Sequence, residues 1–432
     1  MLEKDTKFSA QGGPASGWDV AVIGGGPAGI MASIQSARNG LRVVLIEKNS
    51  KLGKKMLLTG GGRCNLTNAE FSAQGGPASG WDLKKFVSNY NNGEFLFHAF
   101  SVFGPKETIE FFNKIGVKTK TEKNGRVFPA SNDADEVLEA LKKELEKSGA
   151  EILYNSEIVD IKKTGKAISK IILKDKEITA RKYILCTGGK SYVQTGSDGA
   201  GYKLAEKLGH TIVKPSPALA PIRIFDDWIK NLQGISLKDV KITVLHNNKK
   251  ILSETGEVLF THYGISGPAI LDISAKVGEL LEKGETKISL DLSPLLNQEQ
   301  LLKEFEEYLK GYPNKTIKNI LTEFAQERLA EVLLDVAKID KGKIANNLSK
   351  IERGAVVKIL KNFEMTAEDV MGFELAMVTR GGISLKEIDH KTMQSKIIDN
   401  LFFAGEIIDE DGKTGGFNLQ MCWSTGYLAS QQ

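Results

Sequence analysis

Three glycines near the N-terminus, spaced as Gly24-x-Gly26-x-x-Gly29, have the type and spacing that bind the pyrophosphate of a dinucleotide. Gly24 allows a tight turn between strand and helix, Gly26 lets a phosphate approach the backbone, and Gly29 lets the helix pack closely on the strand. A helix that begins at Pro27 would direct its free N–H groups and positive dipole end at the phosphates. Glu47 follows at roughly the twenty-residue spacing of the acid that binds a ribose hydroxyl. This motif suits a nicotinamide or a flavin dinucleotide equally.

A second glycine-rich stretch, TGGGRCNLTN at 59–68, could lie against a flat or phosphorylated ligand. Successive glycines stabilise neither helix nor strand, so they indicate a close approach of the backbone to a ligand. The polar side chains that follow can direct donors at phosphate, ribityl or ring oxygens. A flexible surface loop is the alternative, and Cys64 is either a thiol beside a reactive ring or a small packed side chain. The candidate residues of this stretch are Lys54, Gly60, Gly61, Gly62, Arg63, Cys64 and Asn65.

Two further glycine-containing turns follow apolar runs later in the chain. Thr187, Gly188 and Gly189 end the run RKYILCTGG. Gly405 and Glu406 end the run LFFAGE, and the segment TGGFNLQ at 414–420 then enters the last expected helix.

The elements that would position these residues alternate between strand and helix in the first half of the chain, which predicts a mostly parallel sheet. Apolar runs VAVI and VVLIEK flank the first motif, and helical periodicity is clearest over 133–147. Three short runs near 157–161, 167–173 and 177–180 predict a small antiparallel meander.

The domain that carries the first motif is expected to be discontinuous, because the apolar run at 401–405 is needed to complete its sheet. Between the two halves, short β-type runs at 219–292 give way to a helical, charged stretch at 297–360. The expected parts are a flexible or added N-terminal segment at 1–18, the dinucleotide domain at 19–209 and 373–432, a β-rich insert at 210–296 and 361–372, and a helical insert at 297–360.

Five segments together resemble one family: TGGGRCNLTN, TGGKSY, FTHYGISGP, TRGGISLKEID and FAGEIIDEDGKTGGFNLQ. The chain is similar to the aminoacetone-oxidase-like family of FAD-dependent, NAD(P)-linked oxidoreductases, within the glutathione-reductase-like superfold. The resemblance implies an α/β fold with a discontinuous, Rossmann-like FAD-binding domain of glutathione-reductase type and an inserted β-barrel-like plus helical domain. The turns at Gly60, Thr187 and Gly405 favour FAD over NAD(P) alone, because a nicotinamide enzyme needs no second cofactor-binding strand end at its C-terminus.

The resemblance also assigns FAD contacts residue by residue. The pyrophosphate would be held by Gly24, Gly26, Pro27, Ala28 and Gly29, and the adenosine ribose region by Glu47 and Lys48. Gly60 to Asn65 would line the inner part of the cofactor, Thr187 to Gly189 and Gly405 would back it, and Glu406 would bind a ribityl hydroxyl. Reduction leaves negative charge on the flavin ring, and the candidate donors that stabilise it are the backbone N–H groups of Gly416, Phe417, Asn418 and Leu419.

The acid–base residue of catalysis is unknown from the sequence. The weak candidates are His262, in a polar stretch rich in turns, Cys64, and Arg380, which could bind an anionic substrate or form a surface salt bridge. We expect two-electron hydride transfer between a small organic substrate and FAD, with NAD(P)H as a candidate electron donor. The alternatives are an NAD(P)-only dehydrogenase and a flavin-binding, RNA-associated protein without redox turnover.

Composition is that of a globular protein with two or three domains. Lys and Arg number 58 against 54 acids, and the charge of +4 is spread along the 432 residues, which argues against a nucleic-acid or membrane-surface partner. The chain has neither a membrane-spanning apolar stretch nor the apolar core of a signal peptide, so we expect a cytoplasmic protein. Three cysteines without C-x-x-C fit a reducing compartment, and we expect no metal site. The oligomeric state is left open.

One segment, FSAQGGPASGWD, occurs twice, at 8–19 and 71–82. The copies have unrelated surroundings, which is not how a structural repeat recurs. The GGPASG within it imitates a phosphate motif, but the second copy lacks a preceding apolar strand and a following helix. We interpret it as a flexible loop without function.

Overall fold

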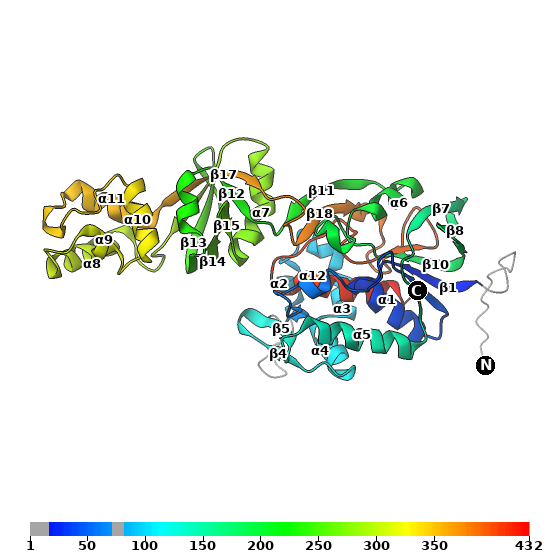
Figure 1. The fold of residues 1–432 in the computed structure, drawn as a ribbon. Coiled ribbons are helices and arrows are strands. Elements are labelled where there is room, and N and C mark those ends of the chain that lie inside the picture. Colours follow the sequence, from blue (N-terminus) through cyan, green and yellow to red (C-terminus); the bar gives the residue numbers. More distant parts are fainter. Residues whose placement is uncertain (1–16, 71–81, 432) are drawn as a thin grey trace. The chain divides into compact units, whose positions relative to one another are not determined.

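The computed structural model describes residues 17–70 and 82–431, which form two compact units (Figure 1). One unit comprises the described residues of 17–215 together with 379–431, and the other comprises residues 216–378. The sequence-based boundaries at 209/210 and 372/373 lie a few residues earlier and stay predictions. Segment 1–16 and most of both copies of FSAQGGPASGWD lie outside the described residues. The structure therefore does not test the interpretation of these copies as flexible loops. None of the helices formed by the described residues is long and apolar enough to cross a bilayer.

A five-stranded parallel sheet forms the centre of the first unit, in the order β19-β10-β1-β2-β6. Val20 of β1 lies opposite Lys182 of β10 on one side and Val43 of β2 on the other. Strand β2 is buried along its whole length, as expected of a parallel sheet covered on both faces. The strands are β1 (Trp18–Ile23), β2 (Val43–Ile46), β6 (Glu151–Leu153), β10 (Ala180–Leu185) and β19 (Leu401–Phe403).

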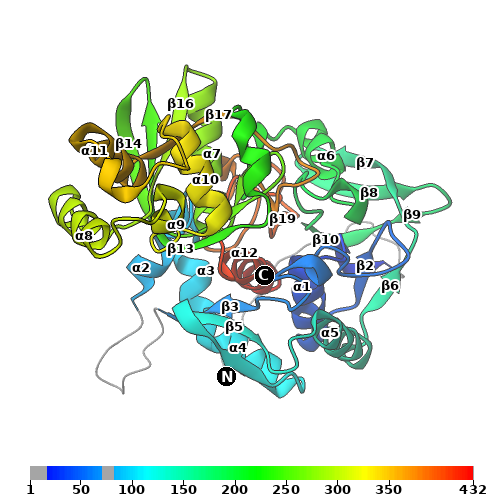
Figure 2. The same cartoon turned by 60° about the vertical axis from the view of Figure 1, so that its left-hand side comes forward.

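Three helices build the layer next to the first glycine motif: α1 (Pro27–Arg38), α5 (Ala134–Ser148) and α12 (Phe417–Ala429). Helix α1 contacts both of the others, and the red α12 lies beside the blue α1 in Figures 1 and 2. Helix α5 confirms the helical periodicity: Asp133 caps its N-terminus and Gly149 ends it in the left-handed conformation. Helix α12 has no separate polar face and is almost wholly buried, which joins the C-terminal segment to the core of the first unit.

The predicted antiparallel meander is confirmed as the sheet β7 (Ile158–Thr164), β8 (Ala167–Leu173) and β9 (Glu177–Ile178). A second three-stranded sheet, in the order β3-β5-β4, supports the TGGGRCNLTN stretch. Its strands are β3 (Thr67–Asn68), β4 (Thr119–Thr121) and β5 (Arg126–Pro129). Further helices of this unit are α2 (Leu83–Val87), α3 (Phe97–Val102), α4 (Pro105–Lys114) and α6 (Ala200–Leu208). The chain passes between the units along the paired strands β11 (Ile212–Ala218) and β18 (Val378–Ile383).

The second unit contains a closed barrel of six strands in the order β12-β15-β14-β13-β16-β17. Alternating apolar residues such as Val240, Ile242 and Val244 face its core, and α7 (Pro268–Leu281) packs against β14 and β17. The strands are β12 (Ile222–Ile224), β13 (Ser236–His246), β14 (Lys249–Phe260), β15 (Gly264–Ser266), β16 (Thr286–Asp291) and β17 (Phe363–Val370).

Four helices follow the barrel strand β16: α8 (Gln298–Gly311), α9 (Ile317–Leu321), α10 (Glu327–Val336) and α11 (Lys350–Lys361). Side chains of Asn297, Thr316 and Ser349 accept backbone hydrogen bonds at the starts of α8, α9 and α11, which explains where these helices begin. The predicted α/β class with an inserted barrel-like and helical part is confirmed.

Candidate functional site

A cleft of about 1060 Å³, counted with its opening to solvent, lies at the carboxyl edge of the parallel sheet. Four strands end in it: Gly24 follows β1, Glu47 follows β2, Thr187 lies just beyond β10 and Gly405 just beyond β19. Ligands of open parallel sheets bind at this edge, where the strand order reverses. The topology therefore brings turns from both ends of the sequence into one site.

The first glycine motif forms the floor of the cleft, and each glycine has a different reason to be there. Gly24 has a φ of +103°, and a Cβ on it would lie 2.5 Å from the carbonyl oxygen of Cys186. A Cβ on Gly29 would lie 1.9 Å from the carbonyl oxygen of Gly24, so helix and strand could not pack as they do. A Cβ on Gly26 would meet no atom within 4 Å. Gly26 thus borders open space, and a ligand can approach its backbone and the N-terminus of α1.

The carboxylate of Glu47 is buried in the cleft wall and braces the turn. Its Oε2 accepts a hydrogen bond from the Gly25 N–H at 2.8 Å, and its Oε1 accepts two from the backbone and side chain of Asn49, both at 2.7 Å. Lys54 donates to Asn49 Oδ1 at 3.0 Å. Lys48 instead forms an ion pair with Asp198 at 2.8 Å. The carboxylate of Glu47, which the sequence assigns to the ribose, is therefore held in one orientation by Gly25 and Asn49.

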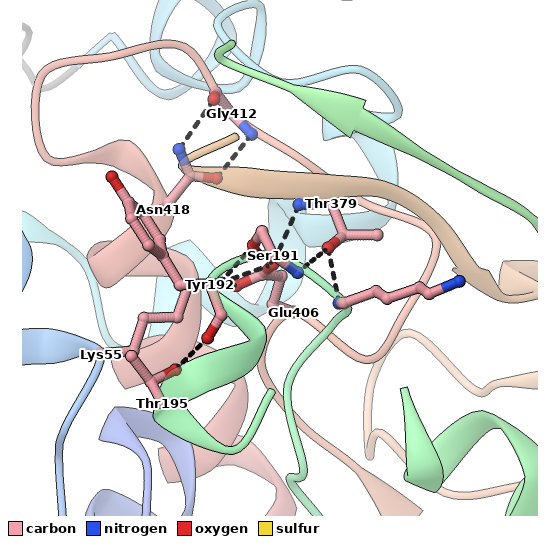
Figure 3. Close-up of polar contacts among 9 residues, drawn as sticks. Lys55, Ser191, Tyr192, Thr195, Thr379, Glu406, Gly412 and Asn418 are labelled. Atoms are coloured by element: carbon pink, nitrogen blue, oxygen red, sulfur yellow. Dashed lines mark hydrogen bonds and ion pairs between the residues drawn. The ribbon is translucent and has the colours of Figure 1, made fainter. Parts of the chain in front are cut away.

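Glu406 lies in a polar network with three other side chains (Figure 3). Lys55 Nζ lies 2.7 Å from Glu406 Oε2, while Oε1 accepts hydrogen bonds from Ser191 Oγ at 3.0 Å and from the Thr379 N–H at 2.9 Å. Thr379 Oγ1 in turn accepts from the N–H groups of Lys190 and Ser191. The sequence assigns Glu406 and Lys54 to the cofactor site, and it does not single out Lys55. The pairing joins residues far apart in the chain, so no local pattern could have revealed it.

Two hydroxyl groups of the cleft have no partner among the described residues, although their oxygen atoms are buried. They are Thr187 Oγ1 and Ser197 Oγ. A buried hydroxyl without a hydrogen bond is costly, so a polar ligand is the natural partner for each. The cleft wall also carries Lys51, Lys54 and Lys55, which suit a phosphate-containing ligand. The donors and acceptors present therefore fit the pyrophosphate and sugar of FAD.

The structure brings together about half of the residues assigned from the sequence. Those that line the cleft are Gly24, Gly26, Pro27, Ala28, Glu47, Lys48, Lys54, Thr187, Gly188, Gly405 and Glu406. Those that lie outside its described lining are Gly29, Gly60, Gly61, Gly62, Arg63, Cys64, Asn65, Gly189, Gly416, Phe417, Asn418 and Leu419. Lining residues absent from the sequence assignment include Asn49, Lys51, Lys55, Cys186, Ser197, Asp198 and Cys422.

The TGGGRCNLTN stretch forms a turn with three exposed glycines at positive φ, followed by buried residues. Arg63 pairs with Glu122 at 3.0 Å and lies over the ring of Phe128, 3.9 Å from its centroid, so its guanidinium anchors the turn to the β3-β5-β4 sheet. Burial raises the pKa of the Cys64 thiol to about 12. Such a thiol stays protonated at neutral pH, which supports the packed-thiol interpretation over a nucleophile.

The N-terminus of α12 follows Gly416, whose φ is +103°. The Asn418 side chain closes the preceding loop, because its Oδ1 accepts from the Gly412 N–H at 2.9 Å and its Nδ2 donates to the Gly412 carbonyl at 2.8 Å. Further along the helix, Trp423 Nε1 donates to the Leu66 carbonyl at 3.0 Å. This bond, together with the one that Asn68 Nδ2 donates to the Gly415 carbonyl at 3.0 Å, holds α12 and the loop before it against the TGGGRCNLTN stretch.

The weak catalytic candidates do not line the cleft among the residues that the structure describes. Arg380 forms a bidentate ion pair with the buried Asp411, with Nε–Oδ1 at 2.9 Å and Nη2–Oδ2 at 3.1 Å. His262 is exposed in the turn between β14 and β15 of the second unit, edge-on to the ring of Tyr263. The contacts of Arg380 favour its role in an ion pair over substrate binding.

Comparison with known proteins identifies the family of this chain. A family model described as the HI0933-like protein Rossmann domain matches residues 18–432. The chain belongs to the HI0933-like family. This HI0933-like chain is 33% identical to the 3-dehydro-bile acid delta(4,6)-reductase of Clostridium scindens, over 95% of its own length and 98% of the relative's. It is 31% identical to the ribosomal RNA dihydrouridine synthase of Haemophilus influenzae, over 95% and 96% of the two lengths.

The shared fold also extends to a more distant solved structure. The 3-ketosteroid delta1-dehydrogenase from Sterolibacterium denitrificans aligns with a TM-score of 0.54 and 12% identity, over 96% of this HI0933-like chain and 98% of that one. The family membership confirms the resemblance inferred from the motifs, the Rossmann-type FAD-binding fold and the class of FAD-dependent oxidoreductase. NAD(P)H as electron donor stays a prediction.

Proposed function

We propose that this enzyme reduces a carbon–carbon double bond conjugated with a carbonyl group, by two-electron transfer between a small organic substrate and FAD. NAD(P)H is the proposed electron donor. The observation that carries the proposal is the cleft at the carboxyl edge of the sheet, with the open backbone at Gly26 and the unpartnered hydroxyls of Thr187 and Ser197. These groups are of the kinds that a dinucleotide binds.

The substrate class follows from the chemistry that two relatives have in common. The name of the Clostridium scindens relative describes a substrate with a keto group at C3 and double bonds at C4 and C6, which are conjugated with it. The name of the Haemophilus influenzae relative describes reduction of uridine, whose C5–C6 double bond is conjugated with the C4 carbonyl. Both are reductions of an electron-poor double bond. We infer the same bond type here and a small organic molecule as its carrier.

The chain contributes a rigid cradle for the cofactor. The backbone around Gly26 and the start of α1 would bind the pyrophosphate, and Glu47 would accept from a ribose hydroxyl through a carboxylate already fixed by Gly25 and Asn49. Bound FAD would supply two-electron chemistry, in which a hydride passes from reduced nicotinamide to one carbon of the substrate double bond and a proton from solvent adds to the other carbon. Because the cradle is formed in advance, binding would require little rearrangement of these residues.

Two further groups would act on the inner half of the cofactor. Glu406 would accept a hydrogen bond from a ribityl hydroxyl, while Lys55, Ser191 and Thr379 keep its carboxylate in one orientation. The free N–H groups that follow Gly416 at the start of α12 would stabilise negative charge next to them.

Anaerobic absorption spectroscopy tests the proposal. Purified protein, or protein given FAD, should show a flavin band that NADH or NADPH bleaches. A steroid acid with a conjugated 3-keto group should restore the band, whereas its saturated 3-keto counterpart, the matched control, should not. Absence of the band even after addition of FAD would refute the cofactor. Restoration by a small amine's imine product, and not by conjugated ketones, would refute the substrate class.

A second candidate function is reduction of a uracil base within RNA, and the 31% identity to the ribosomal RNA dihydrouridine synthase favours it. Against it stands the charge of +4 spread over the chain, which provides little excess for binding phosphates. Incubation of ribosomal RNA with the protein and NADPH separates the two. Gain of two hydrogens by a uridine, detected by mass spectrometry, would support the RNA substrate, and unchanged RNA together with a reduced steroid acid would support the small-molecule substrate.

A further inference from the structure

The helical part of the second unit ends, on the side away from the barrel, in two neighbouring loops. Helix α8 follows the barrel strand β16, α11 leads back into β17, and the two helices contact each other. The C-terminal end of α8 and the N-terminal end of α11 therefore lie far from the barrel. We call residues 310–316 and 344–351, which form this end, the helical tip.

Backbone hydrogen bonds join the two loops of the helical tip. The Ala345 N–H donates to the Lys315 carbonyl at 2.9 Å, and the Asn346 N–H donates to the Pro313 carbonyl at 3.1 Å. The tip therefore presents its side chains from a backbone that is already ordered. Contact with a partner would cost little additional backbone entropy.

Three large apolar side chains of the helical tip are exposed to solvent. The exposed fractions are 43% for Tyr312, 36% for Ile344 and 85% for Ile351, the second residue of α11. A single exposed apolar side chain is ordinary on a protein surface, whereas several at one end of a structure indicate a contact site. These three side chains form the apolar component of the tip.

The helical tip is also basic. Its lysines Lys310, Lys315 and Lys350 are exposed, and neither of its two segments contains an aspartate or a glutamate. The whole chain, by contrast, has 58 basic residues against 54 acids. The Lys315 ammonium lies 3.9 Å from the centre of the Tyr312 ring, so charge and apolar surface are in direct contact. Positive charge is therefore concentrated where apolar side chains are exposed.

We propose that the helical tip binds the surface of an anionic lipid bilayer. Lysines next to such a surface are attracted by its negative potential, and tyrosine is favoured at the level of the headgroups. Ile344 and Ile351 would be buried at the boundary with the acyl chains. A nucleic acid would use the lysines, but it offers an aliphatic side chain neither stacking nor a hydrogen bond. The inference does not depend on the proposed reaction.

Sedimentation with vesicles tests the proposal on the full-length protein. One set of vesicles contains phosphatidylcholine alone, and the other contains equal parts of phosphatidylcholine and phosphatidylglycerol. The wild type should sediment with the second set and stay in solution with the first. Higher ionic strength should release it, because salt screens exposed charges.

Two variants separate the basic and the apolar component of the tip. The combined change Lys310→Gln, Lys315→Gln and Lys350→Gln should weaken binding roughly hundredfold, at about fivefold for each lysine. Ile351→Ser should weaken it roughly tenfold, because this side chain is no longer buried in the bilayer. All four side chains are exposed, so the midpoint of thermal unfolding should equal that of the wild type.

Matched controls come from exposed side chains elsewhere in the second unit. Leu295, which is 96% exposed before the start of α8, is changed to serine as the control for Ile351. The exposed lysines Lys249, Lys250 and Lys283 of the barrel part are changed to glutamine as the control for the three tip lysines. Both control proteins should bind the anionic vesicles as the wild type does.

Three results would overturn the proposal. The first is a wild type that binds neither set of vesicles or binds both equally, which needs no variant to fold. The second is an equal loss of binding in the control proteins, which would assign the attraction to overall charge. The third is a wild type that binds single-stranded polyuridylate but no vesicles, with binding lost in the triple lysine variant and kept in Ile351→Ser. That result would assign the tip to a nucleic acid.

Discussion

Substitution of single glycines in the first motif should separate ligand binding from folding. Gly26 and Gly29 are three residues apart, yet their surroundings differ completely. A Cβ on Gly26 meets no atom within 4 Å, and its φ of −82° is open to any residue. A Cβ on Gly29 would lie 1.9 Å from the Gly24 carbonyl oxygen, a backbone atom that cannot rotate away. We therefore expect Gly26→Ala to affect the ligand and Gly29→Ala to affect the fold.

The magnitudes follow from these contacts. In Gly26→Ala, the lower entropy of the unfolded chain, worth about 0.4–1 kcal/mol, offsets the poorer N-cap, so the free energy of unfolding of the apoprotein should change by less than about 1 kcal/mol. The added methyl group would occupy the side from which a phosphate approaches the backbone. Loss of one charge-assisted hydrogen bond there costs about 2 kcal/mol, or roughly a thirtyfold weaker affinity for FAD. Overpacking in Gly29→Ala should lower the free energy of unfolding by about 3 kcal/mol.

Urea unfolding of the apoproteins and fluorescence titration with FAD measure the two effects independently. The reasoning is refuted if Gly26→Ala binds FAD as tightly as the wild type, because the open side of Gly26 would then not face the cofactor. Equal stability of Gly29→Ala and the wild type would show that the close contact with Gly24 relaxes without cost.

Three more changes test the contacts around the site. Arg380→Ala should lower the free energy of unfolding, measured in urea, by about 3 kcal/mol, because the buried carboxylate of Asp411, whose side chain is 5% exposed, loses the guanidinium that pairs with it. Unchanged stability with a higher KM would instead indicate that Arg380 binds an anionic substrate. Burial raises the pKa of Glu410 from 4.5 to about 8. Between these two pH values the folded protein keeps a proton that the unfolded chain releases, so the free energy of unfolding should fall as the pH rises from 4.5 to about 8. Glu410→Gln should flatten that fall in urea unfolding measured from pH 5 to 9, and a slope equal to the wild type's would assign it to another group. Lys55→Met should weaken FAD binding and lower the stability of the apoprotein by about 1–2 kcal/mol, because Glu406 then has no cation; equal affinity and stability would mean that water replaces the ammonium group at no cost.

Much of the fold could be predicted because its signals are local. The periodicity over 133–147 reappears as α5, and the three short runs after it reappear as β7, β8 and β9. The shift from β-type to helical composition within the insert reappears as a barrel followed by four helices. Apolar periodicity and turn residues act over a few neighbours, so a sequence shows them directly.

The site could be predicted only in part. The glycines of the first motif were identified because a tight turn and a close helix contact restrict the residue type at the position itself. By contrast, the sequence assigns Arg63 to the cofactor, which stays a prediction, and the structure shows its guanidinium pairing with Glu122 and covering Phe128. A guanidinium can bind a phosphate or a carboxylate equally well, and only the neighbours brought by folding decide which one it meets.

The sequence by itself determined the dinucleotide-binding turn, the discontinuous domain and the family. The tertiary structure decided that Lys55 pairs with Glu406 and that Thr187 and Ser197 present unpartnered hydroxyls to the cleft. It also decided that Asn65 Oδ1 has no hydrogen-bond partner among the described residues, whereas the Asn68 amide is bonded. The physical reason is that a tight turn or a close backbone contact restricts the residue type at a single position, whereas the partners of a polar side chain come from strands and helices distant in the chain. Whether a buried donor or acceptor is satisfied is known only when those elements have been brought together.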